Sequence, residues 1–408
     1  KQLNDNEYKS YTASKIADHP NQAHLTAEQK EILARMLNQF EVIFEGRPSK
    51  FKGLKVKFDM KEGSKPFYGR PYPLPEAHRQ VFKRALDQMV QHDVLAKTYE
   101  DSEWASPTFG VPKKNNAIRI VSDFRRLNQA IKRSPWPIPT IRELLNKCGG
   151  MMFATAIDQI MGYWGIEMHP SIQRVLTIIT PFGKYYYKKL PMGLKISADI
   201  FQREMMKLTE GIEGVLVYID DLLIISKGTY EEHIKVVEQV LQRMKEKDLQ
   251  VNIDKSNFAV QQVEYLGYIL TRDGIRPQPK KVQAILDMSK PKTAKQLRGF
   301  IGTVNFYRDL FRGRAHHLAP LTSLLKGVKR GPIKWTAEAE QAFETVKQIC
   351  AKDALLHFPN FNKRFFLYTD SSDFQLGAIL SQDGRVIVYW SRKCRTRRKS
   401  TAPLPKNY

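Results

Sequence analysis

Three aspartates stand where an apolar core would be expected. Asp220 and Asp221 lie at the centre of GVLVYIDDLLIIS, which covers residues 214–226, and the run FATAID ends on Asp158. Burying an unpaired carboxylate costs several kcal/mol, so each aspartate needs a hydrogen bond, a counter-ion or a metal. Two magnesium ions bridged by shared carboxylates need this kind of ligand set. The three aspartates therefore predict a two-metal site.

The adjacent pair also constrains the backbone. Successive side chains on a strand point to opposite faces, so Asp220 and Asp221 can serve one site only across a tight turn. The runs VLVYI and LLIIS have only this pair between them, which predicts a hairpin with both aspartates as its turn. We expect Asp220 to be the principal ligand with Asp158, and Asp221 to be an accessory charge. The alternative is two exposed aspartates in a polar turn, where Asp is favoured.

Composition indicates a globular protein with a polyanionic partner. The 408 residues, 42% of them hydrophobic, are expected to form about two to four domains. Sixty-six Lys and Arg against 42 Asp and Glu leave a net charge of +24, which favours nucleic acid as the partner. No apolar run reaches the roughly 18 residues of a membrane span. Three scattered cysteines without metal-ligand spacing indicate a reducing, intracellular compartment.

Periodic patterns predict mixed helices and strands around the aspartates. Thr26 and Gln29 form a capping box before a helix that reaches Phe40, and PEAHRQVFKRALDQMVQHDVLAK reads as a second amphipathic helix. FATAID alternates with a period of two, which is typical of a strand. Residues 105–128 predict two short strands around a polar turn. This basic hairpin could hold a triphosphate or simply face solvent.

A later stretch, KQLRGFIGTVNFYRDLF, has apolar residues at helical spacing. Thr293 and Gln296 can form its capping box, and Gly299 and Gly302 would permit close approach on one face. Taken alone, this pattern is more typical of ordinary helix packing than of a nucleic-acid contact.

Eight segments, in order between about residues 65 and 400, resemble reverse transcriptases of the retroviral type. The surroundings match the gypsy-type (Metaviridae) branch of LTR retrotransposons. The segments are WASPTFGVPKK, RIVSDFRRLNQ, AIDQIMGYWGIEMHP, LPMGLKISADIFQREM, YIDDLLIIS, VEYLGYILTRDGIRP, KPKTAKQLRGFIGTVNFYRDLF and FFLYTDSSDFQLGAIL.

The resemblance implies an α+β fold, a right-hand polymerase with fingers, palm and thumb followed by a partial ribonuclease H-like α/β segment. We expect a lead-in helix and linker over 1–65, fingers and palm over 66–270, thumb and connecting helices over 271–360, and the incomplete ribonuclease H-like segment with a basic tail over 361–408. The ribonuclease H site needs further acidic ligands that the family places downstream, so that activity is expected to belong to a longer parent polyprotein.

The resemblance also implies individual roles. The catalytic, metal-binding carboxylates would be Asp158, Asp220 and Asp221, with two Mg²⁺ ions for which Mn²⁺ can substitute. The nucleotide-binding residues would be Lys113, Lys114, Arg119, Tyr163 and Met192, with Tyr163 as the steric gate against the ribose 2′-hydroxyl. The primer grip would be Leu266, Gly267 and Tyr268. Lys255 would be a proton donor to pyrophosphate, and Asp370 the first metal ligand of the ribonuclease H site.

The implied function is RNA-directed DNA polymerisation by two-metal nucleotidyl transfer. The implied partners are an RNA template, a DNA or tRNA primer, the RNA–DNA hybrid and deoxynucleotides, with no membrane; assembly would be as a homodimer or with other Pol or Gag products. The implied location is intracellular, in cytoplasmic virus-like particles or the nucleus. The alternative is a domesticated, non-catalytic scaffold that binds RNA or protein.

Overall fold

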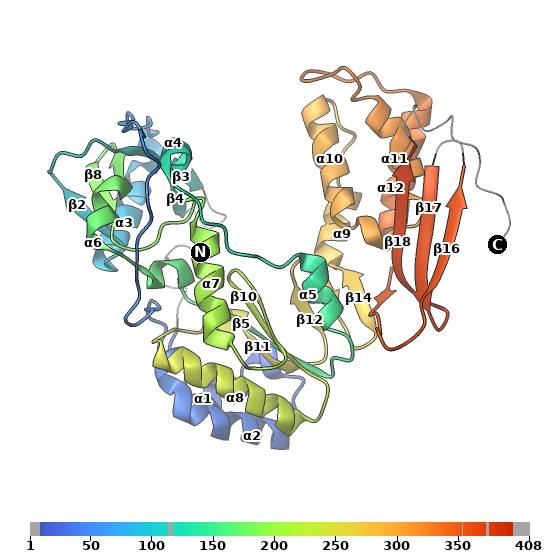
Figure 1. The fold of residues 1–408 in the computed structure, drawn as a ribbon, viewed down its shortest axis with the longest axis horizontal. Helices are drawn as coiled ribbons and strands as arrows, with labels where there is room; N and C mark the ends of the chain where they lie inside the picture. The colour runs from blue at the N-terminus through green and yellow to red at the C-terminus, as the bar shows by residue number, and fades with distance from the viewer. Residues whose placement is uncertain (1–8, 113–116, 353, 373–374, 395–408) are drawn as a thin grey trace. The chain divides into compact units, whose positions relative to one another are not determined.

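The structure is a computed structural model that describes residues 9–112, 117–352, 354–372 and 375–394. Contacts within the chain divide it into two compact units (Figure 1). The first unit combines Lys1–Thr140 with Met152–Val260, and the second combines Ile141–Met151 with Gln261–Tyr408. No helix within the described part of the chain is both long and apolar enough to cross a membrane.

A four-stranded antiparallel sheet forms the centre of the first unit, in the order β11-β5-β10-β9. The four consecutive residues 222–225 of β10 are all buried, so both faces of this sheet are covered. Helix α8 packs against β5, β10 and β11, and α7 packs against β9 and α8. The bounds are Phe153–Asp158 for β5, Val215–Tyr218 for β9, Asp221–Ser226 for β10, Asn257–Val260 for β11, Ser197–Thr209 for α7 and Tyr230–Glu246 for α8.

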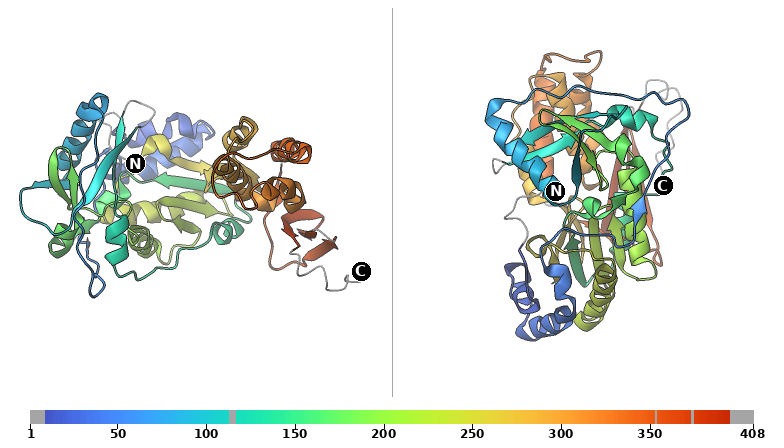
Figure 2. Two further views of the ribbon diagram at one scale, coloured as in Figure 1. Left: turned by 90° about the horizontal axis from the view of Figure 1, so that it is seen from above. Right: turned by 90° about the vertical axis from the view of Figure 1, so that its left-hand side faces the viewer.

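The lead-in stretch packs into the core of the first unit. It forms α1 (Ala13–Ala17), η1 (Pro20–Gln22), α2 (Ala27–Leu37) and η2 (Asn38–Phe44). The predicted capping box of Thr26 and Gln29 is confirmed at the start of α2. Figures 1 and 2 show α2 alongside α8. The buried apolar residues of α2 belong to the same hydrophobic cluster as the buried apolar residues of α8 and β11.

A five-stranded sheet lies in the order β2-β8-β7-β3-β4, with α3 packed against β2 and β4. Helix α3 ends at Gln91, before the end of the predicted amphipathic stretch, because the chain turns at Asp93 (φ 57°) and pairs as β2. The predicted basic hairpin is confirmed as β3 and β4, although its turn lies outside the described residues. The bounds are Glu76–Gln91 for α3, Leu95–Thr98 for β2, Ser106–Pro112 for β3, Ile118–Ser122 for β4, Thr177–Thr180 for β7 and Gly183–Tyr187 for β8.

Short elements complete the first unit. β1 and β6 pair in parallel, and the remaining elements are single helical turns or short helices. They are β1 (Lys55–Val56), α4 (Arg125–Ala130), η3 (Gly162–Gly165), β6 (Glu167–Met168), α6 (Pro170–Gln173), η4 (Arg174–Leu176) and η5 (Ile253–Lys255).

The second unit contains a sheet in the order β12-β13-β14-β15, a helical layer, and a sheet in the order β16-β17-β18. The predicted capping box of Thr293 and Gln296 begins α10. The bounds are α5 Ile141–Lys147, β12 Val263–Tyr265, β13 Tyr268–Leu270, β14 Gly274–Pro277, α9 Pro279–Leu286, α10 Ala294–Phe306, η6 Arg308–Leu310, α11 Arg314–Ser323, α12 Ala337–Ala351, β15 Leu356–His357, β16 Phe366–Ser371, β17 Gln375–Gln382 and β18 Arg385–Lys393.

Candidate active site

Asp158 and Asp221 face each other across adjacent strands. Asp158 ends β5, Asp221 begins β10, and the two are Cα partners in the antiparallel register. The backbone N–H and C=O of Asp158 both point away from β10, to Ser256 Oγ (3.0 Å) and Asn252 N (2.8 Å). The pair is therefore a non-hydrogen-bonded one, in which Cα atoms lie about 4.5 Å apart and side chains leave the same face. The register brings two of the three predicted carboxylates together.

The turn of the hairpin differs by one residue from the prediction. The two residues between β9 and β10 are Ile219 and Asp220, and Asp221 already belongs to the return strand, paired with Tyr218. The prediction that Asp220 and Asp221 form the turn was therefore wrong. Asp220 and Asp221 are both exposed; Asp220 lies in the turn, and Asp221 lies opposite Asp158. The division into a principal and an accessory ligand stays a prediction.

Ile219 has a backbone conformation that its side chain disfavours. Its φ of 55° lies in the left-handed region, where a β-branched residue is an outlier that surrounding structure must hold in place. Gln202, fully buried on α7, provides that restraint. Its Oε1 accepts the N–H of Ile219 at 2.6 Å, and its Nε2 donates to the carbonyl of Val217 at 3.1 Å. One side chain therefore ties both sides of the turn to α7.

A buried histidine joins the two aspartate-bearing strands to α8. His233 Nε2 lies 2.8 Å from Thr155 Oγ1 on β5, and its Nδ1 lies 2.9 Å from Ser226 Oγ on β10. The same Thr155 hydroxyl accepts the N–H of Ala259 on β11 at 3.0 Å. Burial lowers the pKa of His233 from 6.5 to about 4, so the neutral ring belongs to the folded state. The network fixes three strands to one helix.

We expect this histidine to make the first unit acid-sensitive. The unfolded chain binds a proton at His233 below about pH 6.5 and the folded chain does not, so stability is complete above pH 6.5 and falls as the pH drops toward 4. By pH 5 the loss from this group is about 2 kcal/mol. Urea unfolding at pH 7 and pH 5 measures it. His233→Gln, which keeps a neutral donor and acceptor, should lose about 2 kcal/mol less over that interval; equal losses would contradict the assignment.

Tyr163 lies beside the turn. It belongs to η3, five residues after Asp158, and its ring stacks on Phe201 of α7 with centroids 4.7 Å apart and planes 16° apart. Burial first, and the charge of Asp220 second, raise the pKa of Tyr163, so its hydroxyl stays protonated. At Gly162, an added Cβ would lie 2.7 Å from Phe201, so only glycine allows this packing. The predicted gate residue is thus half-buried and close to Asp220.

The other predicted nucleotide-binding residues occupy separate elements. Arg119 is exposed on β4, opposite Val111 of β3. Met192 is exposed in the loop before α7; Ser197 Oγ donates to the carbonyl of Pro191 at 2.7 Å to hold that loop. Lys113 and Lys114 lie outside the described residues. Their binding roles stay predictions.

The predicted primer grip is the turn of a hairpin in the second unit. Leu266 (φ 47°) and Gly267 (φ 89°) connect β12 to β13. Tyr307 donates a hydrogen bond to the carbonyl of Gly267 at 2.8 Å, and the ring of Tyr268 stacks on Phe306. The hairpin is therefore docked on the end of α10.

Two further predictions concern α10 and Asp370. An added Cβ at Gly299 or Gly302 would meet no atom within 4 Å, so these glycines lie on an open face. Asp370 is exposed on β16, opposite Gly377 of β17.

Within residues 9–112, 117–352, 354–372 and 375–394, no three His, Cys, Asp or Glu side chains are grouped as a ready metal site. Lys255 is exposed in η5, within the 252–256 segment whose ends bond to the backbone of Asp158.

Sequence reasoning missed the residues that support the aspartates. Gln202 follows Ile200 and Phe201 on the apolar side of α7, where a polar residue is the signal of a buried hydrogen bond. Ser256 and Asn252 carry no such signal, because they lie in an irregular segment. Only the three-dimensional arrangement identifies them.

Two family models match the chain. Residues 111–270 match "Reverse transcriptase (RNA-dependent DNA polymerase)", and residues 335–407 match "RNase H-like domain found in reverse transcriptase". The second match begins at residue 335, before the boundary at residue 361 expected from the sequence.

Curated relatives are polyproteins of transposons. The chain is 36% identical over 399 residues to the retrovirus-related Pol polyprotein from transposon opus of Drosophila melanogaster, covering 92% of this chain and 40% of the relative. It is 32% identical over 418 residues to the one from transposon 297 of the same organism (95% and 38%). Against the Tf2-7 polyprotein of Schizosaccharomyces pombe it is 31% identical over 371 residues (90% and 27%). The chain thus spans less than half of these relatives.

Solved structures share the fold. The foamy viral protease-reverse transcriptase dRH in complex with double-stranded DNA matches with a TM-score of 0.87 at 21% identity, covering 99% of this chain and 72% of that one. The foamy viral protein in complex with an RNA/DNA hybrid matches with a TM-score of 0.86 at 22% identity, covering 96% and 54%. These matches confirm the predicted α+β polymerase fold with a ribonuclease H-like segment. The chain belongs to the reverse transcriptase family, in the branch found in LTR retrotransposon Pol polyproteins.

Proposed function

We propose that the chain is an RNA-directed DNA polymerase that works by metal-dependent nucleotidyl transfer. The observation that carries this proposal is the opposition of Asp158 and Asp221 at the end of the β5–β10 pair, with Asp220 one residue before. Like charges directly opposite each other on adjacent strands destabilise a sheet. A polymerase needs closely placed carboxylates to bind divalent cations, whereas a scaffold does not. A bound cation attracts both carboxylates and so offsets their mutual repulsion.

The three carboxylates supply the kind of oxygen ligand that magnesium takes, although the described residues do not draw them together as a ready metal site. Mg²⁺ prefers oxygen ligands and is usually held by one or two carboxylates, with substrate phosphates and water in its other positions. Asp158, Asp220 and Asp221 would hold two such ions, and Mn²⁺ suits the same ligands. When bound, the ions supply stabilisation of the attacking and leaving oxygens of the in-line displacement. Asp158 and Asp221 leave one face of the sheet at the strand ends, where a primer terminus could approach.

The remaining predicted residues complete the proposal. Arg119 would contact the triphosphate through its planar fork of donors, and Met192 would line the nucleotide pocket. Lys255 would donate a proton to pyrophosphate, and Leu266–Tyr268 would hold the primer. The partners would be an RNA template, a primer, the resulting hybrid and deoxynucleotides, inside intracellular particles.

Primer extension tests the function. The native chain, given an RNA template, an annealed DNA primer and deoxynucleotides, should extend the primer with Mg²⁺ or Mn²⁺, and a chelator should stop it. Hybrid binding, followed by fluorescence anisotropy, should weaken steeply with salt because Lys and Arg contacts release counterions. Salt-sensitive binding without extension under any metal condition would exclude the polymerase and leave the scaffold.

Tyr163→Ala tests the proposed gate. Removing the ring should raise ribonucleotide incorporation relative to deoxynucleotide by about 100-fold, because a single hydroxyl is otherwise excluded only by shape. Single-nucleotide extension with each triphosphate measures the ratio of kcat/KM values. Phe201→Leu is the matched control, since it removes the stacking partner and leaves the tyrosine ring. Unchanged discrimination in Tyr163→Ala would show that Tyr163 is only a packing residue.

A further inference from the structure

The backbone of Asp158 is held by one short segment. Asn252 donates its N–H to the carbonyl of Asp158 at 2.8 Å, and Ser256 Oγ accepts the N–H of Asp158 at 3.0 Å. Ser256 Oγ in turn donates to the carbonyl of Asn252 at 2.7 Å, which closes the loop. The direction in which the Asp158 side chain leaves β5 therefore depends on where residues 252–256 lie.

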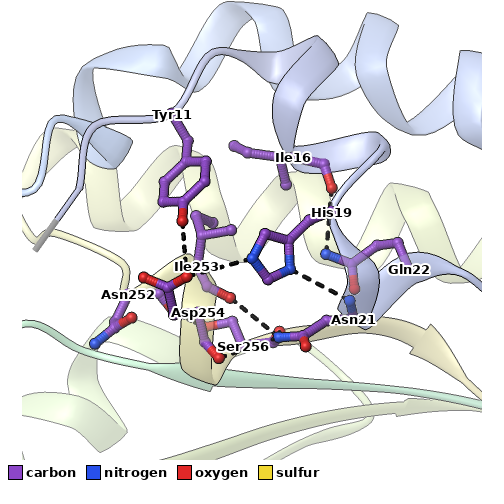
Figure 3. Close-up of polar contacts among 9 residues, drawn as sticks. All are labelled: Tyr11, Ile16, His19, Asn21, Gln22, Asn252, Ile253, Asp254 and Ser256. Atoms are coloured by element: carbon purple, nitrogen blue, oxygen red, sulfur yellow. Dashed lines mark hydrogen bonds and ion pairs between the residues drawn. The ribbon is translucent and has the colours of Figure 1, made fainter. Parts of the chain in front are cut away.

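That segment is itself held by the lead-in stretch, which lies more than 230 residues earlier in the chain. Figure 3 shows Asn21 of η1 pointing its amide into the turn. Its Nδ2 lies 3.0 Å from the carbonyl oxygen of Ser256, 3.2 Å from that of Asp254 and 3.3 Å from that of Ile253. A single amide group thus serves three carbonyl groups of the turn.

Two more lead-in side chains hold the carboxylate of Asp254 (Figure 3). Tyr11 donates its hydroxyl to Asp254 Oδ1 at 2.7 Å, and His19 Nε2 lies 3.3 Å from the same oxygen. Because His19 Nδ1 accepts the N–H of Asn21, Nε2 carries the proton in the neutral ring and donates it to Asp254. Burial, with Asp254, raises the pKa of Tyr11 to about 12, so it remains a donor.

We propose that Asn21, assisted by Tyr11 and His19, is a positioning residue for Asp158: it holds the 252–256 turn, which sets the backbone of the aspartate. This inference rests on the proposed polymerase function for its effect on catalysis. The geometric part stands on the hydrogen bonds alone. A displacement of about 1 Å at a reacting centre can lower a rate about 100-fold, so such a chain of contacts can matter to activity.

The positioning role can be separated from folding. The lead-in packs on α8 through α2 and η2, and its fully buried apolar side chains include Ile16, Leu33 and Phe44. Those contacts do not involve Asn21, which is only half-buried. Replacing its amide should therefore release the turn while the lead-in helices stay in place.

The experiment compares Asn21→Asp with Thr26→Ala in the full chain. Asn21→Asp keeps the shape but sets a carboxylate against three carbonyl oxygens. Thr26→Ala removes the capping box of α2, in the same lead-in and without a contact to the turn. Hydrogen exchange of residues 153–160 and single-nucleotide extension are measured for both, well below each melting temperature. Tyr11→Phe is a milder variant that removes one hydroxyl.

Asn21→Asp should speed exchange at the Asp158 amide about tenfold. It should also lower kcat by roughly 10- to 100-fold with the KM for template–primer within about 2-fold. Thr26→Ala should change neither quantity. The inference would be overturned if the Asp158 amide of Asn21→Asp exchanged at the native rate. It would also be overturned if Asn21→Asp and Thr26→Ala lost kcat equally. If the native chain extends no primer, the proposed function fails, and exchange alone still decides whether Asn21 holds Asp158.

Discussion

Asp158→Asn is expected to lower primer extension by at least about 1,000-fold, which corresponds to about 4 kcal/mol of transition-state stabilisation. Asparagine has the same shape, so the substitution removes one negative charge and one anionic oxygen ligand from the end of β5. The fold should tolerate it. Asp158 faces Asp221 across a non-hydrogen-bonded pair, so neutralising one member removes a like-charge repulsion. The variant should be at least as resistant to urea as the native chain.

Loss of rate with retained stability is the signature of a residue that works in the reaction. Single-nucleotide extension and urea unfolding measure the two quantities, and hybrid binding should stay within about 3-fold of the native affinity, since one charge is changed among many contacts. Asp87→Asn is the control, because Asp87 is an exposed carboxylate on α3 that pairs with Lys83. Extension by Asp158→Asn within tenfold of the native rate would remove the aspartate from the proposed mechanism.

The elements whose signals are local could be predicted from the sequence. The period-two run ending on Asp158 is β5, with the predicted bounds. The capping boxes at Thr26 and Thr293 begin α2 and α10, because a cap satisfies backbone donors only a few residues away. The meeting of Asp158 with the hairpin followed from the need of each carboxylate for a partner. The inferences about β5 and the two capping boxes use contacts within a strand or one helical turn.

The rest depends on residues far apart in the sequence. The hairpin turn lies at Ile219 and Asp220 because Gln202 on α7 holds it there and because β10 pairs with β5 in one register. Without that clamp, two adjacent aspartates are the better local candidates for a turn. Likewise, the amphipathic pattern of α2 indicates a buried face but not which helix covers it. The proposed support of Asp158 by Asn21 runs through residues that are more than 230 positions apart in the sequence. No short window of sequence contains both partners.

Gln202→Leu is expected to destabilise the first unit by about 2–4 kcal/mol, because it leaves two buried groups, the N–H of Ile219 and the carbonyl of Val217, without their hydrogen bonds. It should also lower kcat by about 100-fold. Ile219 is held at a φ of 55° that costs about 1–3 kcal/mol, and without the clamp that strain can relax by moving Asp220. Urea unfolding and single-nucleotide extension measure the two effects.

Gln202→Glu separates the two hydrogen bonds. The glutamate keeps an acceptor for the N–H of Ile219 but sets a second oxygen against the carbonyl of Val217, so it should retain more activity than the leucine variant. Val237→Ala is the stability control. Val237 is fully buried on α8, and its side chain has no polar atom that could hydrogen-bond to the turn. If Val237→Ala and Gln202→Leu lose stability equally and also lose kcat equally, the rate loss comes from general loosening of the core. A rate loss confined to the Gln202 variants, and partly reversed by adding Ile219→Gly, would instead locate it in the strained turn, since glycine adopts this φ without cost.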